Sequence, residues 1–313
     1  MKYALKKVLM MLITMVIVSF FAFLAFQIIP GDPTTKILGD DATPEAVAEL
    51  RAELGLDRPF IVRYSEWIIN AVQGDFGSSY VYSQPVSELL GGKLAVTGLL
   101  TAIAFILIIV VSLPLGIFLS ENRSKIFEKA GIIVNQIVMS IPPFFTGILL
   151  TLFFGLVLHW FTPGKFVSPQ IDFWSCAGYL VYPAIAISLP RIAMTVKMLR
   201  SSIKTELEKD YVRTSYSRGN SQNATLYRHI LKNAIAPIIT FLAMTIADIV
   251  AASIVVEQVF TIPGLGKLLL TSIENRDFPV VQAIVVILAL WVVLINGIAD
   301  LVNQRIDPRL RLG

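Results

Sequence analysis

The chain has 313 residues, of which 55% are hydrophobic and 15% are charged, and its mean hydropathy is +0.72. Soluble domains carry about 25% charged residues, so this composition excludes an ordinary soluble domain. One cysteine excludes an internal disulfide, and two histidines far apart in the sequence form no His-rich metal site. We expect membrane lipids around this chain and no nucleic-acid partner.

Six apolar segments are long enough to cross a hydrocarbon core of about 30 Å as helices. Backbone groups in lipid need internal partners, so helices are required. The expected fold class is therefore an all-α membrane protein with six transmembrane helices and a small extracytoplasmic cap between the first two. The spans lie at 8–29, 94–119, 130–160, 173–199, 233–256 and 278–299.

The 26 Lys and Arg residues gather mainly in alternate connections. The positive-inside rule then predicts that both termini are cytoplasmic. The basic N-terminus resembles a signal peptide, but its apolar run is too long and lacks a small-residue cleavage site, so we expect a retained anchor. This organisation predicts four parts: a tail and first helix at 1–29, an extracytoplasmic segment at 30–93, a five-helix core at 94–302 and a cytoplasmic tail at 303–313.

The extracytoplasmic segment contains two predicted helices. Thr43-Pro44-Glu45 is typical of a helix start, with an N-cap, a first-turn proline and an early acid, and Gly55 would close that helix. A second helix is predicted from Pro59 to Val72. Its Trp67 either rests at the headgroup level or packs against a neighbouring helix.

Within the third span, Pro142-Pro143 would interrupt the helix, because proline lacks a backbone N–H and clashes with the preceding turn. The interruption is either a gate in a transport path or a packing kink.

A polar, basic connection at 200–232 separates the fourth and fifth spans. Glu206–Ser217 lacks Gly and Pro and is predicted to form a helix, which Gly219 would end in the left-handed conformation. Ser221 can cap a following helix. Because loops that touch nothing are usually short, this length favours a docking surface for a cytoplasmic partner over a solvated loop.

Asp248 stands in the middle of the fifth span. An ionisable side chain at that depth costs roughly 2.5 kcal/mol or more, so it should face a path or a partner group. Two readings stay open: a residue of the translocation path that meets a cation, or a structural hydrogen bond or ion pair with a neighbouring helix. Pro142 and Thr245 are further candidates for the path. Arg191, near the end of the fourth span, is expected to snorkel to the headgroups.

Several segments, in order and at matching spacing, resemble the permease subunits of ABC importers for peptides and nickel. They cover nearly the whole chain, and together they are far more specific than any one fragment. They are Ile28-Ile-Pro-Gly-Asp-Pro33, 50–59, 74–77, Asp210-Tyr-Val-Arg-Thr214 with Gly219, 228–237, 256–266, 275–279 and 307–311.

The resemblance implies a type I ABC importer permease fold, with connection 200–232 as the coupling loop that sits in a groove of a cytoplasmic ATPase. The residues that it assigns to this coupling are Glu208, Asp210, Tyr211, Arg213, Thr214, Ser215, Arg218 and Gly219.

The implied partners are a second homologous permease, two cytoplasmic ABC ATPases and an extracytoplasmic substrate-binding protein, in the cytoplasmic membrane of a prokaryote. The sequence contains no Gly-x-x-x-x-Gly-Lys-Ser/Thr phosphate loop. ATP and Mg are therefore expected on the partner ATPases, with no catalytic, cofactor or metal site in this chain. The expected cargo is di- or oligopeptides, with nickel or a metal chelate as the alternative. A self-sufficient secondary transporter is a further alternative, against which no inverted repeat is visible.

Overall fold

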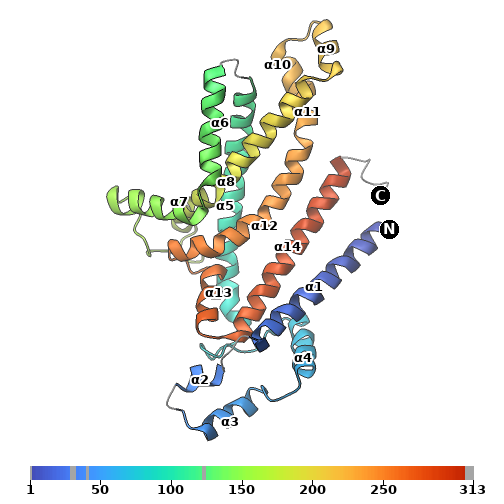
Figure 1. Cartoon of the computed structure of the whole chain (residues 1–313). Coiled ribbons are helices and arrows are strands. Elements are labelled where there is room, and N and C mark those ends of the chain that lie inside the picture. The colour runs from blue at the N-terminus through green and yellow to red at the C-terminus, as the bar shows by residue number, and fades with distance from the viewer. Residues whose placement is uncertain (1, 29–32, 40–41, 122–124, 307–313) are drawn as a thin grey trace. The chain divides into compact units, whose positions relative to one another are not determined.

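The structure is a computed structural model that describes residues 2–28, 33–39, 42–121 and 125–306 (Figure 1). Within those residues it is built of helices, and the one pairing of extended backbone is an isolated bridge between Ser78 and Pro85. The chain divides into two compact units, Met1–Thr97 with Pro263–Leu294 and Gly98–Ile262 with Ile295–Gly313.

The first unit holds the segment between the first two spans and the helices that flank it. Its helices are α1 (Lys2–Ile28), α2 (Pro33–Leu38), α3 (Pro44–Glu53), α4 (Phe60–Val72), the start of α5 (Val86–Glu121), α13 (Leu265–Glu274) and most of α14 (Phe278–Ile306).

The second unit holds the rest of α5 and the polar connection. Its other elements are α6 (Lys125–Ser140), α7 (Pro143–Leu150), the π-helix η1 (Thr151–Val157), α8 (Phe173–Leu207), α9 (Asp210–Ser217), α10 (Gln222–Thr225), the π-helix η2 (Leu226–Ile230), α11 (Leu231–Ala234), α12 (Ala236–Val259) and the end of α14.

Five helices among the described residues are long and apolar enough to span a membrane, and a sixth span is present if α6 with α7 and η1 counts as one. The predicted spans are therefore confirmed at α1, α5, α8, α12 and α14. Several helices extend beyond the predicted spans: α1 begins at Lys2, α5 begins at Val86, α8 continues to Leu207 and α14 continues to Ile306. The apolar side chains of α1 are largely exposed within this single chain, as expected of a surface that meets lipid or another subunit.

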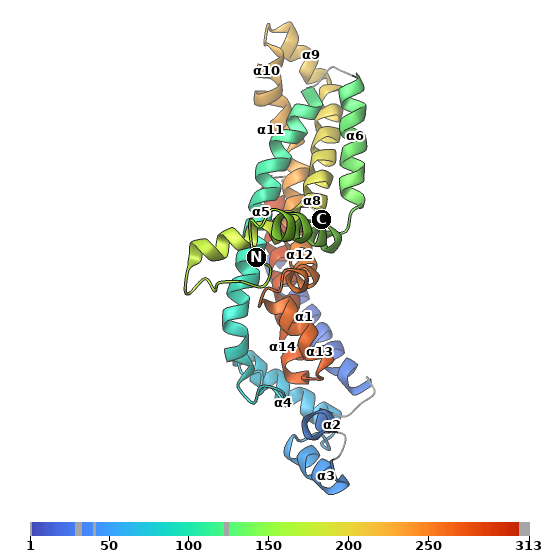
Figure 2. The ribbon, with the colours of Figure 1, turned by 90° about the vertical axis from the view of Figure 1, so that its left-hand side faces the viewer.

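The third predicted span is not one straight helix. α6 ends at Ser140, Pro142 is extended (φ −63°, ψ 143°), and α7 begins at Pro143 with a bend of 95°. A residue before a proline avoids the helical region, and the second proline then suits the first helical position. Figures 1 and 2 show α7 leaving α6 sideways, so the interruption is far larger than the packing kink that the sequence allowed.

α8 is the central helix of the second unit and packs against α6, α7 and α12. Its buried face carries Leu180, Ile187 and Leu199. α5 comes close at Gly116, where a Cβ atom would lie 2.8 Å from Leu199 Cδ2. Tyr179 donates a hydrogen bond of 2.7 Å from its hydroxyl to the Phe260 carbonyl, which ties the N-terminal part of α8 to the residue after α12.

The predicted helix starts in the segment between the first two spans are confirmed. Thr43 caps α3 by accepting a hydrogen bond of 3.3 Å from the Ala46 N–H, and Gly55 follows that helix with φ +65°. Trp67 of α4 packs on Phe23 of α1, with ring centroids 5.9 Å apart. The packing alternative for Trp67 therefore holds.

A buried carboxylate holds the first unit together. Asp277 is fully buried just before α14 and accepts hydrogen bonds from the Ser79 hydroxyl and from the Tyr80 N–H, the latter at 3.0 Å. The N-terminus of α13 is fixed in the same way, because the Leu265 N–H donates to the Thr97 hydroxyl oxygen at 2.9 Å. Residues far apart in the sequence are thus joined by side-chain acceptors that satisfy backbone donors.

Some predicted features lie outside the described residues. They are 29–32 of the Ile28–Pro33 motif, 122–124 of the basic connection before α6, and 307–313 of the tail.

We predict that Asp277→Ala destabilises the protein, because it leaves two buried donors without an acceptor. The expected loss is about 2–4 kcal/mol of unfolding free energy. Thermal unfolding of the detergent-solubilised protein, followed by tryptophan fluorescence, measures it. Asp57→Ala is the control, since Asp57 forms an exposed ion pair with Arg51 at 3.2 Å and should change stability by less than about 0.5 kcal/mol. Equal losses in the two variants would contradict the role of Asp277.

Candidate functional site

The polar connection after α8 forms a folded-back helical loop, at the top of Figure 1. The predicted helix Glu206–Ser217 is wrong at its start: α8 runs through Leu207, the chain is extended at Lys209 (φ −77°, ψ 148°), and α9 begins at Asp210. Asp210 in the first turn of α9 places a negative charge at the positive end of the helix dipole.

Gly219 ends α9 as predicted, with φ +82°. The Gly219 N–H donates to the Tyr216 carbonyl at 2.9 Å, and the Asn220 N–H donates to the Ser215 carbonyl at 3.3 Å. These two bonds form a Schellman motif, which needs a left-handed residue and therefore favours glycine. Ser221 then caps α10 by accepting from the Ala224 N–H at 3.2 Å, so the chain reverses within a few residues.

Hydrogen bonds on the inner side hold the loop rigid. Glu206 is nearly buried and accepts from Lys209 Nζ at 2.5 Å and from the Tyr211 hydroxyl at 2.7 Å. Burial is the main cause that raises the pKa of the Tyr211 phenol. The buried hydroxyls of Ser215 and Thr225 lie 2.9 Å apart and join α9 to α10.

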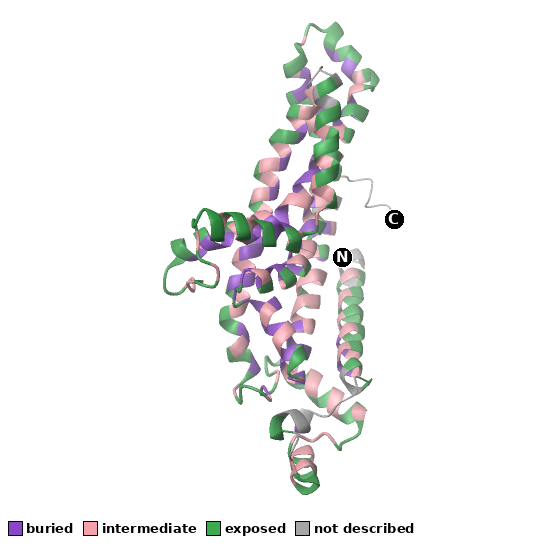
Figure 3. Ribbon diagram, turned by 60° about the vertical axis from the view of Figure 1, so that its left-hand side comes forward, coloured by how far each residue is buried: buried purple, intermediate pink, exposed green. Residues whose placement is uncertain are grey.

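The outer side of the loop is polar and open. Of the eight residues assigned to coupling, six are exposed and two face inward: Tyr211 is half-buried and Ser215 is buried, so both brace the loop. Figure 3 shows the loop as a largely exposed tip. The exposed six are Glu208, Asp210, Arg213, Thr214, Arg218 and Gly219.

The loop is also connected to the helices that enter the membrane region. The Ser202 hydroxyl of α8 donates to the Ala234 carbonyl of α11 at 2.9 Å. α11 leads into α12 after a single residue, Ile235. The loop is therefore connected to both α8 and α12.

The two charged residues of the fourth and fifth spans form an ion pair. Arg191 Nη1 lies 3.1 Å from Asp248 Oδ2, and both residues sit near the middle of their helices, α8 and α12. Arg191 therefore does not simply reach for the headgroups, as the sequence suggested. The ion-pair alternative for Asp248 is present in the structure, while 34% of the Arg191 side chain and 47% of the Asp248 side chain remain exposed.

The other two path candidates differ in exposure. Thr245 lies one turn before Asp248 on α12, is fully buried and donates from its hydroxyl to the Phe241 carbonyl at 2.9 Å. Pro142 is exposed at the bend before α7. The sequence signal that would have found the pair is simply two unlike charges in two neighbouring spans.

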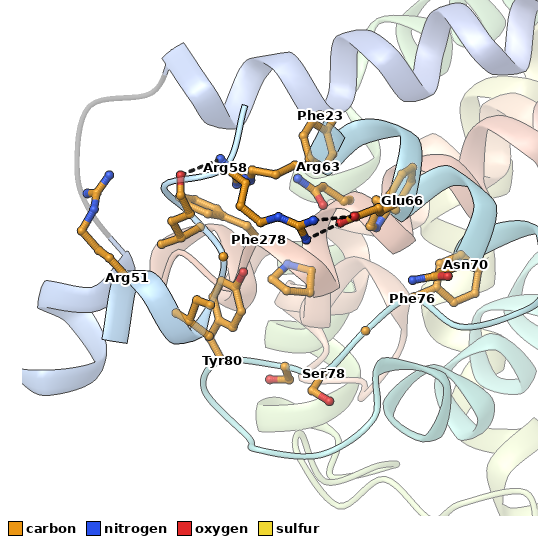
Figure 4. Close-up of a pocket in the computed structure, with 18 of the residues that line it drawn as sticks. Phe23, Arg51, Arg58, Arg63, Glu66, Asn70, Phe76, Ser78, Tyr80 and Phe278 are labelled. Atoms are coloured by element: carbon orange, nitrogen blue, oxygen red, sulfur yellow. Dashed lines mark hydrogen bonds and ion pairs between the residues drawn. The ribbon is translucent and has the colours of Figure 1, made fainter. Parts of the chain in front are cut away.

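The segment between the first two spans lines an open pocket of about 900 Å³, which the sequence did not predict (Figure 4). The ends of α1 and α3, with α4 and the start of α14, form its walls. Arg58 pairs with Glu66 there through two bonds of 2.7 and 2.8 Å. Burial is the main cause that raises the pKa of Tyr80 on the opposite wall. Among the described residues, no group of three or more His, Cys, Asp or Glu side chains could hold a metal ion.

Comparison with solved structures supports the fold. A chain of the MetNI methionine ABC transporter, solved in inward-facing conformations, matches 68% of this chain and 94% of its own length with a TM-score of 0.55. Its sequence identity is 17%, so the likeness concerns the fold alone. The permease fold expected from the sequence is thereby confirmed.

Full-length relatives are known. A permease protein of Brucella abortus (strain 2308), named for a peptide transport system, is 35% identical over 310 residues, with 98% of each chain covered. The glutathione transport system permease protein GsiC of Salmonella choleraesuis (strain SC-B67) is 33% identical and covers 99% of this chain and 98% of its own. The oligopeptide transport system permease protein AppB of Bacillus subtilis (strain 168) is 32% identical over 98% of both chains.

Family models cover almost the whole sequence. The model for the binding-protein-dependent transport system inner membrane component matches residues 112–312, and the N-terminal model of the same kind of protein matches residues 1–101. With this coverage and the full-length relatives, the chain is a multi-pass membrane protein that belongs to the family of binding-protein-dependent transport system inner membrane components, the permease subunits of ABC transporters.

Proposed function

We propose that this chain is one of two permeases in an ATP-driven importer that carries di- or oligopeptides across the cytoplasmic membrane of a prokaryote. The observation that carries the proposal is the full-length similarity to relatives named for peptide, oligopeptide and glutathione transport. Nickel or a metal chelate, the alternative cargo, has no such support from these relatives.

The proposal places both termini and the loop 200–232 in the cytoplasm, as the distribution of Lys and Arg favours. The exposed residues of α9 would then meet a groove of a cytoplasmic ATPase. Two ATPases bind ATP and Mg, since the sequence lacks a phosphate-binding loop, and this subunit is not itself an enzyme. A binding protein delivers the cargo from outside, and a second, homologous permease completes the path.

In this mechanism the coupling loop moves as a rigid body. The Glu206 bonds to Lys209 and Tyr211 fix α9 to the end of α8, and the Ser202 bond fixes α8 to α11. When the ATPases close on ATP, the push on α9 therefore reaches α8 and α12, which carry Arg191 and Asp248. Coupling of this kind needs a rigid loop that moves between two positions, because a flexible loop would deform without displacing the helices.

The test of this function is the energy source. With permeases, ATPases and binding protein reconstituted in proteoliposomes, we expect uptake of labelled trialanine to fall to background when ATP is withheld while a proton gradient is kept. The measurement is retained radioactivity after filtration. Uptake driven by the gradient alone would show a secondary transporter and would refute the proposal.

Gly219 should be required for coupling, because it adopts the left-handed conformation that ends α9. Gly219→Pro removes the N–H that bonds to Tyr216 and imposes a φ near −65° where the structure has +82°. We expect normal membrane insertion but at least a roughly tenfold loss of uptake per ATP hydrolysed, since the disrupted turn costs more than about 1.4 kcal/mol.

The matched control is Gly219→Asn, because asparagine tolerates the left-handed conformation better than other side chains. It should retain most of the coupled uptake. If Gly219→Pro transports as well as the unmodified protein, the loop has no role in coupling.

A further inference from the structure

Arg191 and Asp248 are opposite charges in the middle of two adjacent membrane helices. Their 3.1 Å ion pair compensates both charges, yet about a third of one side chain and half of the other remain exposed. A charge near the centre of a bilayer costs several kcal/mol in contact with lipid, so the exposed side of such a pair should face a water-filled path or another subunit.

The surface around the pair is apolar and adaptable. On α12, Met244 and Val255 flank Asp248 at helical spacing, about one turn before it and two turns after it, and both are roughly half exposed. On α8, Met194 follows Arg191 by one turn and is 37% exposed. Methionine is unbranched and flexible, so it can pack against side chains of many shapes.

We propose that Arg191 and Asp248 form a recognition site for zwitterionic peptides within the permease. The Asp248 carboxylate takes the peptide's α-ammonium group and the Arg191 guanidinium takes its α-carboxylate, while the methionines accept side chains of any kind. This inference rests on the proposed function, that the cargo is a peptide. It adds that the permease itself binds the free amino and carboxyl termini of that peptide.

Charge balance is the physical reason for this choice of cargo. Without a peptide, each protein charge is neutralised by the other, and with a zwitterion each is neutralised by the matching terminus. A peptide that lacks one terminal charge would leave one side chain unpaired, which costs more than the bond it replaces. The ends of an extended dipeptide are about 7 Å apart and those of a tripeptide about 10 Å, and the long, flexible arginine side chain can part from Asp248 to admit them.

Peptides with blocked ends test the proposal in the reconstituted importer. Uptake of trialanine is compared with that of N-acetyl-trialanine and of trialanine amide. In Asp248→Asn, the preference for trialanine over the N-acetyl form should fall about tenfold relative to the unmodified permease. In Arg191→Gln, the preference over the amide should fall by a similar factor. The binding protein is the same throughout, so a changed ratio reports the permease.

Two further variants separate recognition from a structural brace. The double substitution Arg191→Gln with Asp248→Asn leaves no unpaired charge in the membrane and should lose both preferences while it still inserts. Asp57→Asn breaks the exposed ion pair with Arg51, which belongs to the first unit and not to α8 or α12, and should change neither ratio.

The outcomes are distinct. If the variants lower uptake of all three peptides equally, the pair only braces α8 against α12 and the inference is overturned. If the unmodified importer hydrolyses ATP but takes up none of the three peptides, the proposed cargo itself is wrong, and the inference falls with it.

Discussion

The hydrocarbon core of a membrane can neither donate nor accept hydrogen bonds, and most structural features of this chain follow from that constraint. Backbone polar groups in the apolar segments must pair within their own helices, so the described residues form long helices rather than sheets. The same constraint explains why the charged side chains Arg191, Asp248 and Asp277 have partners. Arg191 and Asp248 neutralise one another, and Asp277 is buried only where a hydroxyl and a backbone N–H donate to it.

Two departures from straight helices have local causes in the sequence. Two adjacent prolines lie where α7 turns by 95° away from α6, and Phe144 and Phe145 at the start of α7 are exposed. The extended residue Lys209 and the left-handed Gly219 set α9 apart from α8 as a short, charged helix. These breaks do not loosen the chain, because side chains such as Glu206 and Ser215 bond across them.

Under the proposed function, this permease would have to meet two different requirements. The loop would have to transmit a displacement without bending, and its inner hydrogen bonds suit that role. The surface around Asp248 would have to accept varied cargo, and the exposed methionines beside the ion pair suit that role. Because α8 and α12 carry both features, one rigid displacement would alter the surroundings of the ion pair.

The sequence by itself determined the features that depend on residues close together in the chain. Apolar runs predicted the spans, Thr43 and Ser221 predicted helix starts, and Gly219 predicted a left-handed end, because caps and turns are satisfied within a few residues. Full-length similarity of motifs identified the family. Only the tertiary structure decided which distant polar groups meet: Arg191 with Asp248, Ser79 with Asp277, and Thr97 with Leu265. It also placed Thr245 in the core and Ser215 inside the loop. Such pairings depend on how whole helices pack, and the order of residues along one helix does not specify the face that its neighbour will cover.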